Sequence, residues 1–219
     1  MKLTRSICSR EIKKTNVLDS KGEIIGKVGD LTFAFDGELS LSKFILAGSR
    51  WDEFLESIKV RPNKDPVFDS SLIERIDDHV HLNTTVDSLK TTLDSDAIPE
   101  GDIRLSHLER MDIMDKDNKK IGRAIAVNFN LDGTVSMIVG GSFIEEKLEA
   151  AGLKADVDIL VPGDVISEID NMVHLNVSKE SLSTTMDHAL KDKEVLRVQR
   201  DMPVQRDVTK VQLFTQRPV

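Results

Sequence analysis

Residues 73–83 read IERIDDHVHLN and residues 166–176 read ISEIDNMVHLN, so a run ending in Val-His-Leu-Asn occurs twice in the chain. Both runs belong to a longer ungapped repeat, in which residues 48–92 share 17 identical residues with residues 141–185. Chance would give about three identities at ordinary residue frequencies. The duplication therefore decides the architecture, because it predicts that one structural unit is built twice.

The match continues upstream of this window with a spacing of 96 residues in place of 93. The extra three residues fall just after an Asp-Gly pair, where a hairpin tip accommodates a change of length at little cost. The sequence thus predicts a first domain, a linker, a second domain and a basic C-terminal extension, at residues 1–93, 94–101, 102–188 and 189–219. The upstream pairs are Ile7/Ile103, Ile12/Leu108, Asp19/Asp115, Ile25/Ile121, Gly26/Gly122, Phe33/Phe129, Asp36/Asp132 and Gly37/Gly133.

The composition argues against several classes of function. The 219 residues carry a net charge of −8, but residues 191–219 hold seven Lys/Arg and four Asp/Glu, so the remainder carries −11. An acidic body argues against a nucleic-acid-binding core, which needs a clustered basic face. The single cysteine, Cys8, forbids an intramolecular disulfide and indicates a reducing compartment. With no apolar run long enough to span a bilayer and no signal peptide, we expect a cytoplasmic protein without a transmembrane segment.

Strand patterns dominate both copies. Leu31, Phe33 and Phe35 alternate with residues such as Thr32, and the second copy shows the same period with Asn128 on the alternate face. The Asp-Gly pair that follows in each copy predicts a tight hairpin, because glycine tolerates positive φ. Two shorter strands are predicted near the end of each copy, at 72–76 and 80–83, and at 165–169 and 173–176.

The period lengthens to that of a helix between these strands. Ser49 and Ser142 are the expected N-caps, and apolar residues then recur at i, i+3, i+4 and i+7 in the first copy. Gly152 ends the second helix. The sequence therefore predicts a mainly β fold, made of two tandem small β-barrels that each carry one amphipathic helix.

The stretch VLDSKGEIIGKVGD at residues 17–30 and the closing VHLNVSKESL at residues 173–182 resemble a PRC-barrel domain. This resemblance covers nearly all of both repeats and leaves out the tail. It implies tandem PRC-like barrels similar to those of archaeal PRC-barrel proteins. Such proteins link components of a division ring built on a tubulin-like filament or on ESCRT-type polymers.

The resemblance implies a non-enzymatic adaptor for protein–protein interaction in archaeal cell division, acting as a homodimer or a heteromer. Two alternatives stay open. One is an accessory factor of ribosome maturation, since the bacterial ribosome maturation factor carries a PRC-type barrel that touches a ribosomal protein. The other is a barrel that senses a small molecule or a metal, which rests on the fold alone.

His81 and His174 are the repeat-equivalent pair among the five histidines, and Asn83 and Asn176 follow them at the same spacing. Alternation places Val80 and Leu82 inward, so these four polar residues are predicted to face outward. They form either an ordinary solvated strand face or a matched surface pair at an interface. A metal site is a weak third interpretation, because no carboxylate or thiol lies at ligand spacing.

Asp115, Asp117 and Asn118 suggest a calcium loop, but the glycine and glutamate that an EF-hand needs are absent, and a turn is the better interpretation. No phosphate-binding glycine motif and no nucleophile–base pattern appears either. We therefore predict that the chain is not an enzyme, with no catalytic residues, no metal and no cofactor.

The remaining candidates for an interface differ between the two copies. Trp51 fits either a partner-binding hot spot or, in register with Phe54 and Leu55, a residue packed on its own barrel. The tail alternates apolar and polar residues in two runs, 194–200 and 210–214. Such a tail either closes an exposed edge of its own sheet or pairs with the sheet edge of a partner. Its candidate interface residues are Val211, Leu213 and Phe214.

Overall fold

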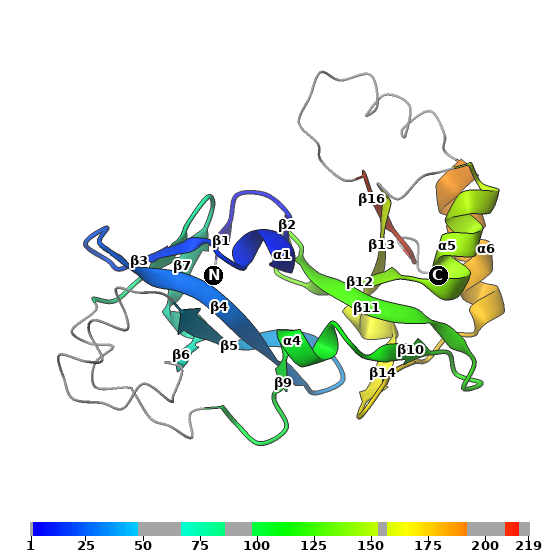
Figure 1. Cartoon of the computed structure of the whole chain (residues 1–219), viewed down its shortest axis with the longest axis horizontal. Coiled ribbons are helices and arrows are strands. Elements are labelled where there is room, and N and C mark those ends of the chain that lie inside the picture. Colours follow the sequence, from blue (N-terminus) through cyan, green and yellow to red (C-terminus); the bar gives the residue numbers. More distant parts are fainter. Residues whose placement is uncertain (1, 48–66, 86–97, 153–156, 192–208, 215–219) are drawn as a thin grey trace. The chain divides into compact units, whose positions relative to one another are not determined.

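The computed structural model of the chain describes residues 2–47, 67–85, 98–152, 157–191 and 209–214. These residues form two compact units (Figure 1). Unit 1 comprises residues 1–108 together with residues 127–135, and unit 2 comprises residues 109–126 and 136–219. The described structure is mainly β, which confirms that part of the fold expected from the sequence.

Sheet A follows the strand order β1-β7-β8-β3-β4-β5-β6, and β9 pairs with β4 off this path. Its neighbours are antiparallel except for the parallel pairs β1–β7 and β3–β8. A 3-10 turn, η1 (Ser70–Leu72), leads into β7. The strands are β1 (Lys2–Leu3), β3 (Asn16–Leu18), β4 (Ile24–Phe35), β5 (Leu39–Ala47), β6 (Val67–Asp69), β7 (Ile73–Ile76), β8 (Val80–Leu82) and β9 (Ile103–Arg104).

Sheet B follows the order β14-β15-β10-β11-β12-β13-β16, and β2 (Ile7–Cys8) pairs with β11 off this path. Its central part repeats that of sheet A, with the parallel pair β10–β15 corresponding to β3–β8. A 3-10 turn, η2 (Gly163–Val165), again precedes the terminal strand. The strands are β10 (Asp112–Met114), β11 (Lys120–Phe129), β12 (Val135–Gly140), β13 (Val157–Pro162), β14 (Ile166–Ile169), β15 (Val173–Leu175) and β16 (Thr209–Gln212).

The two copies exchange their N-terminal arms within unit 1. Strand β2, at the start of the first copy, pairs antiparallel with the end of β11 from the second, with Cys8 opposite Asn128 and Ile7 opposite Phe129. Strand β9, at the start of the second copy, pairs in the same way with β4, and Ile103 lies opposite Phe33. The two pairings are equivalent: Ile103 lies 96 residues after Ile7, and Phe33 lies 96 residues before Phe129. A short helix follows each arm strand: α1 (Ser9–Ile12) after β2 and α4 (Leu105–Leu108) after β9.

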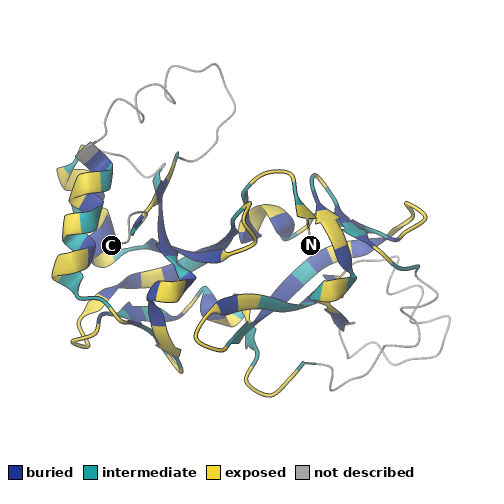
Figure 2. Cartoon of the chain, turned by 180° about the vertical axis from the view of Figure 1, so that it is seen from behind, coloured by how far each residue is buried: buried dark blue, intermediate teal, exposed yellow. Residues whose placement is uncertain are grey.

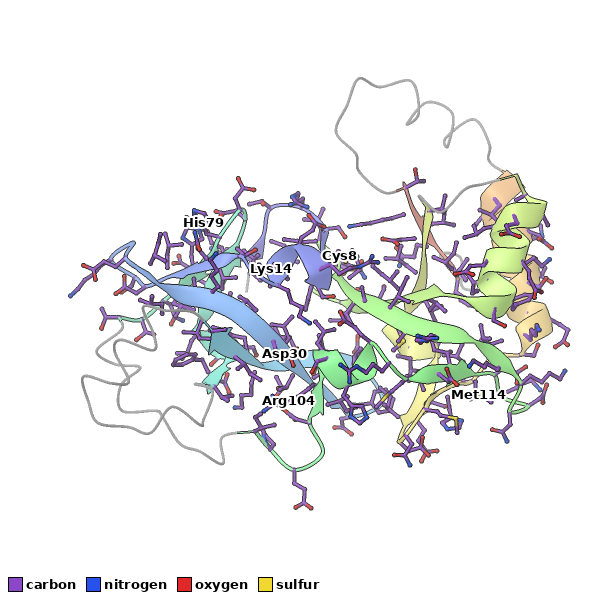
Figure 3. All side chains as sticks on the ribbon, in the orientation of Figure 1. Cys8, Lys14, Asp30, His79, Arg104 and Met114 are labelled. Atoms are coloured by element: carbon purple, nitrogen blue, oxygen red, sulfur yellow. The ribbon has the colours of Figure 1, made fainter. Side chains whose placement is uncertain are left out.

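Polar contacts fix each arm to the strand it covers. Ser9 Oγ accepts the backbone N–H of Val127 at 3.0 Å. In the other arm, one position past the equivalent of Ser9, Ser106 Oγ donates to Asp30 Oδ2 at 2.7 Å, and Figure 3 labels Asp30 on β4. Thr32 Oγ1 donates to Asp102 Oδ2 at 2.9 Å, again joining β4 to the second copy's arm.

The covered strand faces are buried as a result. Thr32 and Asn128, which alternation places opposite the large apolar residues, are both fully buried, because the exchanged segments lie over them. Their hydroxyl and amide groups keep partners there, as buried polar groups require. The strand interiors are largely buried while the hairpin tips are exposed (Figure 2).

Two longer helices, α5 (Ser142–Ala150) and α6 (Lys179–Lys191), belong to unit 2. Helix α5 buries Phe143, Ile144 and Leu148. Its N-cap is Gly141, with φ of 80°, so the prediction of Ser142 as the N-cap is wrong by one residue. Glycine at that position tolerates the positive φ that brings the chain from β12 into the helix. The predicted first-copy helix, with Ser49 as its N-cap, lies outside the described residues.

Gly122 and Gly26 are equivalent in sequence but differ in their surroundings. A Cβ at Gly122 would lie 2.5 Å from the backbone oxygen of Gly140, whereas a Cβ at Gly26 would meet the oxygen of Ala47 at 3.4 Å. We expect Gly122→Ala to lower the free energy of unfolding by about 1–3 kcal/mol, as other overpacked sites do. Gly26→Ala, the matched control, should cost less than about 1 kcal/mol. Urea titration of both variants tests this, and equal losses would contradict it.

Candidate interaction site: the repeated hairpins and the sheet edges

The repeated run that ends in Val-His-Leu-Asn forms the same hairpin in each sheet. In β7–β8, Ile73 lies opposite Leu82 and Ile76 opposite Val80; in β14–β15, the residues 93 positions later occupy the same register. Val80 and Leu82 are buried, and so are the equivalent Val173 and Leu175, which confirms the predicted inward face. The polar residues between them therefore project to the other face of the hairpin.

Aspartate closes the turn of each hairpin and contacts the repeated histidine. Asp77 Oδ1 accepts the backbone N–H of His79 at 2.9 Å and lies 2.9 Å from His81 Nε2. Asp170 Oδ1 accepts the N–H of Met172 at 2.8 Å and lies 3.4 Å from His174 Nε2. Each histidine side chain is about one-fifth exposed, at 18% for His81 and 21% for His174.

These contacts lower the pKa of both aspartates. At Asp77 burial raises the pKa, but the N–H of His79 and the side chains of His81 and Arg75 outweigh it, so the pKa lies below the ordinary value. At Asp170 the N–H of Met172 is the largest cause of the lowered pKa. Ionised aspartate thus stabilises both turns. Each histidine ring uses one of its nitrogen atoms to contact the aspartate of its own hairpin.

Asn83 and Asn176 are exposed and make the same backbone contacts in each copy. Asn83 Nδ2 donates to the carbonyl of Ser71 at 3.1 Å, and Asn176 Nδ2 donates to the carbonyl of Asp164 at 3.2 Å. Their own N–H groups bond the carbonyls of Leu72 and Val165, both at 2.9 Å. Each asparagine therefore ties the end of the hairpin to the 3-10 turn before it, which gives the shared residue a role in the fold.

The outer faces of the two hairpins differ in charge. Arg75 of the first copy bonds His81 at 3.0 Å. The ring centroid of His79, the residue labelled in Figure 3, lies 6.2 Å from that of His81. The equivalent positions in the second copy are Glu168 and Met172. The exposed residues of β7 are thus Glu74 and Arg75, one of each charge, whereas those of β14 are Ser167 and Glu168, which carry one negative charge.

The tail forms an additional strand on sheet B. Strand β16 pairs in parallel with β13, and the N–H of Leu213 continues the ladder to Leu160 O at 3.0 Å. Val211 and Leu213 are buried, which leaves them little surface for a partner, and Phe214 is half-buried. Of the two arrangements expected for residues 210–214, this is the one that closes an edge of the chain's own sheet. Trp51 and the tail run 194–200 lie outside the described residues.

One group of acidic side chains has the spacing of a cation site: oxygen atoms of Asp115, Asp117 and Glu180 lie within 4.8 Å of one another. Asp115 is buried, and its Oδ1 accepts the N–H groups of Asp117 and Lys119 while its Oδ2 accepts that of Lys179. The Lys119 ammonium lies 3.2 Å from Glu180. Backbone donors and a lysine thus engage these oxygens, which favours the predicted turn over a calcium loop.

Comparison with protein-family models and with curated proteins gives no match for this chain. Within the part of the chain that the structure describes, no helix combines the length and apolar character needed to cross a membrane.

The exchanged arms are the structural feature that residue-by-residue reasoning missed. Two hydrogen bonds join the first arm to β11 across more than a hundred residues of sequence: the N–H of Val127 donates to Ser9 Oγ, and Asn128 Nδ2 donates to Ser6 Oγ. The signal in the sequence was the extension of the repeat up to Ile7 and Ile103. A shared position that far upstream of the first predicted turn indicates a structural role for the arm, although it does not indicate which strand the arm joins.

Proposed function

We propose that this protein is a non-enzymatic adaptor that binds other proteins through the edges of its two sheets. The observation that carries the proposal is that each sheet is extended at one end by a short parallel strand from a chain terminus. Strand β1 is added to β7, and β16 is added to β13. A scaffold that accepts added strands at its edges is suited to strand addition by a partner.

The resemblance to PRC-barrel proteins makes the proposal more specific. We propose that the two sheets are tandem PRC-like barrels and that the protein links components of an archaeal division ring, as a homodimer or a heteromer. Support comes from the run at residues 17–30, which forms β3, the turn after it and the start of β4, and from the equivalent arrangement in the second copy. The repeated hairpin residues serve the scaffold, so partner binding falls to positions where the copies differ.

Recovery of the tagged full-length protein from its native cells tests the function. We expect division-ring components to co-purify and the protein to concentrate at mid-cell in dividing cells. Recovery of ribosomal subunits that stay bound at moderate salt would overturn the division proposal in favour of a role in ribosome maturation. A uniform distribution through the cell together with no retained protein would overturn the adaptor proposal itself.

A further inference from the structure

The terminal strands β7 and β14 are local equivalents that differ in whether their outer edge is occupied. Each pairs antiparallel with the next strand, and each shows the same register shift within the first three residues. On its other side β7 carries β1, which runs parallel to it with Lys2 opposite Arg75 and Leu3 opposite Ile76. Among the described residues β14 pairs with β15 alone.

The second copy does not supply its own equivalent of β1. The residues 96 positions after Lys2 and Leu3 are Ile98 and Pro99. Pro99 has no N–H to donate to a strand ladder, and its carbonyl accepts the N–H of Asp102 at 3.1 Å in a turn. Within the described part of the chain, the outer edge of β14 (yellow in Figure 1) thus lacks the strand that covers β7.

The charge along this edge indicates what would bind there. In the first copy Lys2 lies opposite Arg75, a pairing of like charges across neighbouring strands, which disfavours the pair. The position equivalent to Arg75 is Glu168, whose side chain is exposed and makes no ion pair with the other described residues. Asp170, one residue beyond β14, adds a second carboxylate, with its side chain 51% exposed. A strand with a basic residue opposite Glu168 therefore matches β14 better than β1 matches β7.

We propose that the outer edge of β14 is a docking site for a short extended segment of a partner protein. The segment runs parallel to β14, as β1 runs along β7. It carries Lys or Arg opposite Glu168 and an apolar residue opposite Ile169. The backbone ladder supplies attraction to any extended chain, and the carboxylate of Glu168 selects the basic residue. This inference rests on the proposed adaptor function and assigns it a site.

A peptide with the sequence of residues 1–6, Met-Lys-Leu-Thr-Arg-Ser, is the probe, because sheet A shows this sequence as an added strand on the equivalent edge. We expect it to bind the full-length protein saturably and to shift the amide NMR signals of residues 166–169. Glu168→Arg should weaken binding about tenfold, since it turns an opposite-charge pair into a like-charge one. Arg75→Glu is the matched control at the occupied edge and should leave the affinity for the peptide unchanged.

Three results would overturn the proposal: no shift at residues 166–169, equal affinity of wild type and Glu168→Arg, or shifts confined to β7 because the peptide displaces β1. Self-association of the full-length protein that Glu168→Arg abolishes would also overturn it, because a second copy would then occupy the edge. A Glu168→Arg protein that still recovers all cellular partners would refute this site and leave the adaptor function intact. A wild-type protein that recovers no partner would refute the function while the peptide titration still reported on the edge.

Discussion

We expect Phe129→Ala to lower the free energy of unfolding by about 3–5 kcal/mol, which is the usual range for truncating a buried phenylalanine. Phe129 is 1% exposed and lies opposite Ile7 of the exchanged strand β2. Its ring stacks on that of Phe33, the equivalent residue of the first copy, with centroids 6.0 Å apart. The substitution therefore opens a cavity where both copies contribute to unit 1.

Urea titration of the full-length protein measures this loss, and Leu131→Ala is the control. Leu131 lies two residues away in the same hairpin but is 64% exposed, so its truncation should change stability by less than about 0.5 kcal/mol. A double-mutant cycle with Phe33→Ala should give a coupling of about 0.5–1.5 kcal/mol for the ring pair. Losses below about 1 kcal/mol for Phe129→Ala, far under the range for a buried ring, would show that unit 1 does not depend on the exchanged arrangement.

Asp115→Ala should lower the free energy of unfolding by about 3 kcal/mol, because it deprives three backbone N–H groups of a charged acceptor. Two of these groups belong to the turn after β10, and the third, from Lys179, begins helix α6. Loss of the carboxylate should therefore also loosen the start of α6. Hydrogen exchange at residues 179–182 is the measurement that reports this separately from global unfolding.

The same carboxylate predicts a dependence on pH. Burial raises the pKa of Asp115, but the N–H groups of Lys119, Lys179 and Asp117 outweigh it, and the pKa lies below its ordinary value. A lowered folded-state pKa means that the stabilisation is complete above the pKa of an aspartate in the unfolded chain, about 4, and is lost as pH falls through the lower folded value. Wild type should therefore lose stability below about pH 4 more steeply than Asp115→Ala.

Asp117→Ala is the control for both experiments. Its side chain is 44% exposed and contacts Lys116, an exposed pair that contributes little to stability. The substitution should alter the free energy of unfolding by less than about 0.5 kcal/mol and leave the loss of stability at acid pH as steep as in wild type. An Asp115→Ala protein as stable as the Asp117→Ala protein would mean that water replaces the carboxylate at no cost.

Local patterns in the sequence predicted the long hairpin and the short closing hairpin of each copy, but not the strands β6 and β13 or the arm strands β2 and β9. Val80 and Leu82 alternate with His81, and the structure buries the first two, because a strand with one buried face needs that alternation. Gly37 and Gly133 adopt φ of 74° and 88° at the predicted tips, a conformation that few other residues accept. The helix α5 followed from its apolar spacing. Its N-cap was misplaced because serine and glycine are both acceptable cap residues, and the backbone decides between them.

The candidate site followed from the sequence less completely. Alternation correctly placed His81 and Asn83 on the face opposite Val80, but it could not indicate that Asp77 and Ser71 already engage them. The contact of Asp77 depends on how the hairpin turn closes, and that of Ser71 on how the hairpin lies against the 3-10 turn. Likewise, the tail pattern at residues 210–214 fits any sheet edge, and only the folded chain shows that Val211 lies against β13.

The sequence by itself determined that the chain contains one structural pattern twice, that the pattern is mainly β, and where each hairpin turns. These properties are local: period, turn chemistry and glycine conformation act over a few residues. The tertiary structure decided that the arms cross between copies, that Thr32 and Asn128 are buried beneath them, and that among the described residues β14 lacks the strand that covers β7. Strand pairing joins residues of any separation in sequence, and Ile7 carries no local mark that selects Phe129 over Phe33 as its partner.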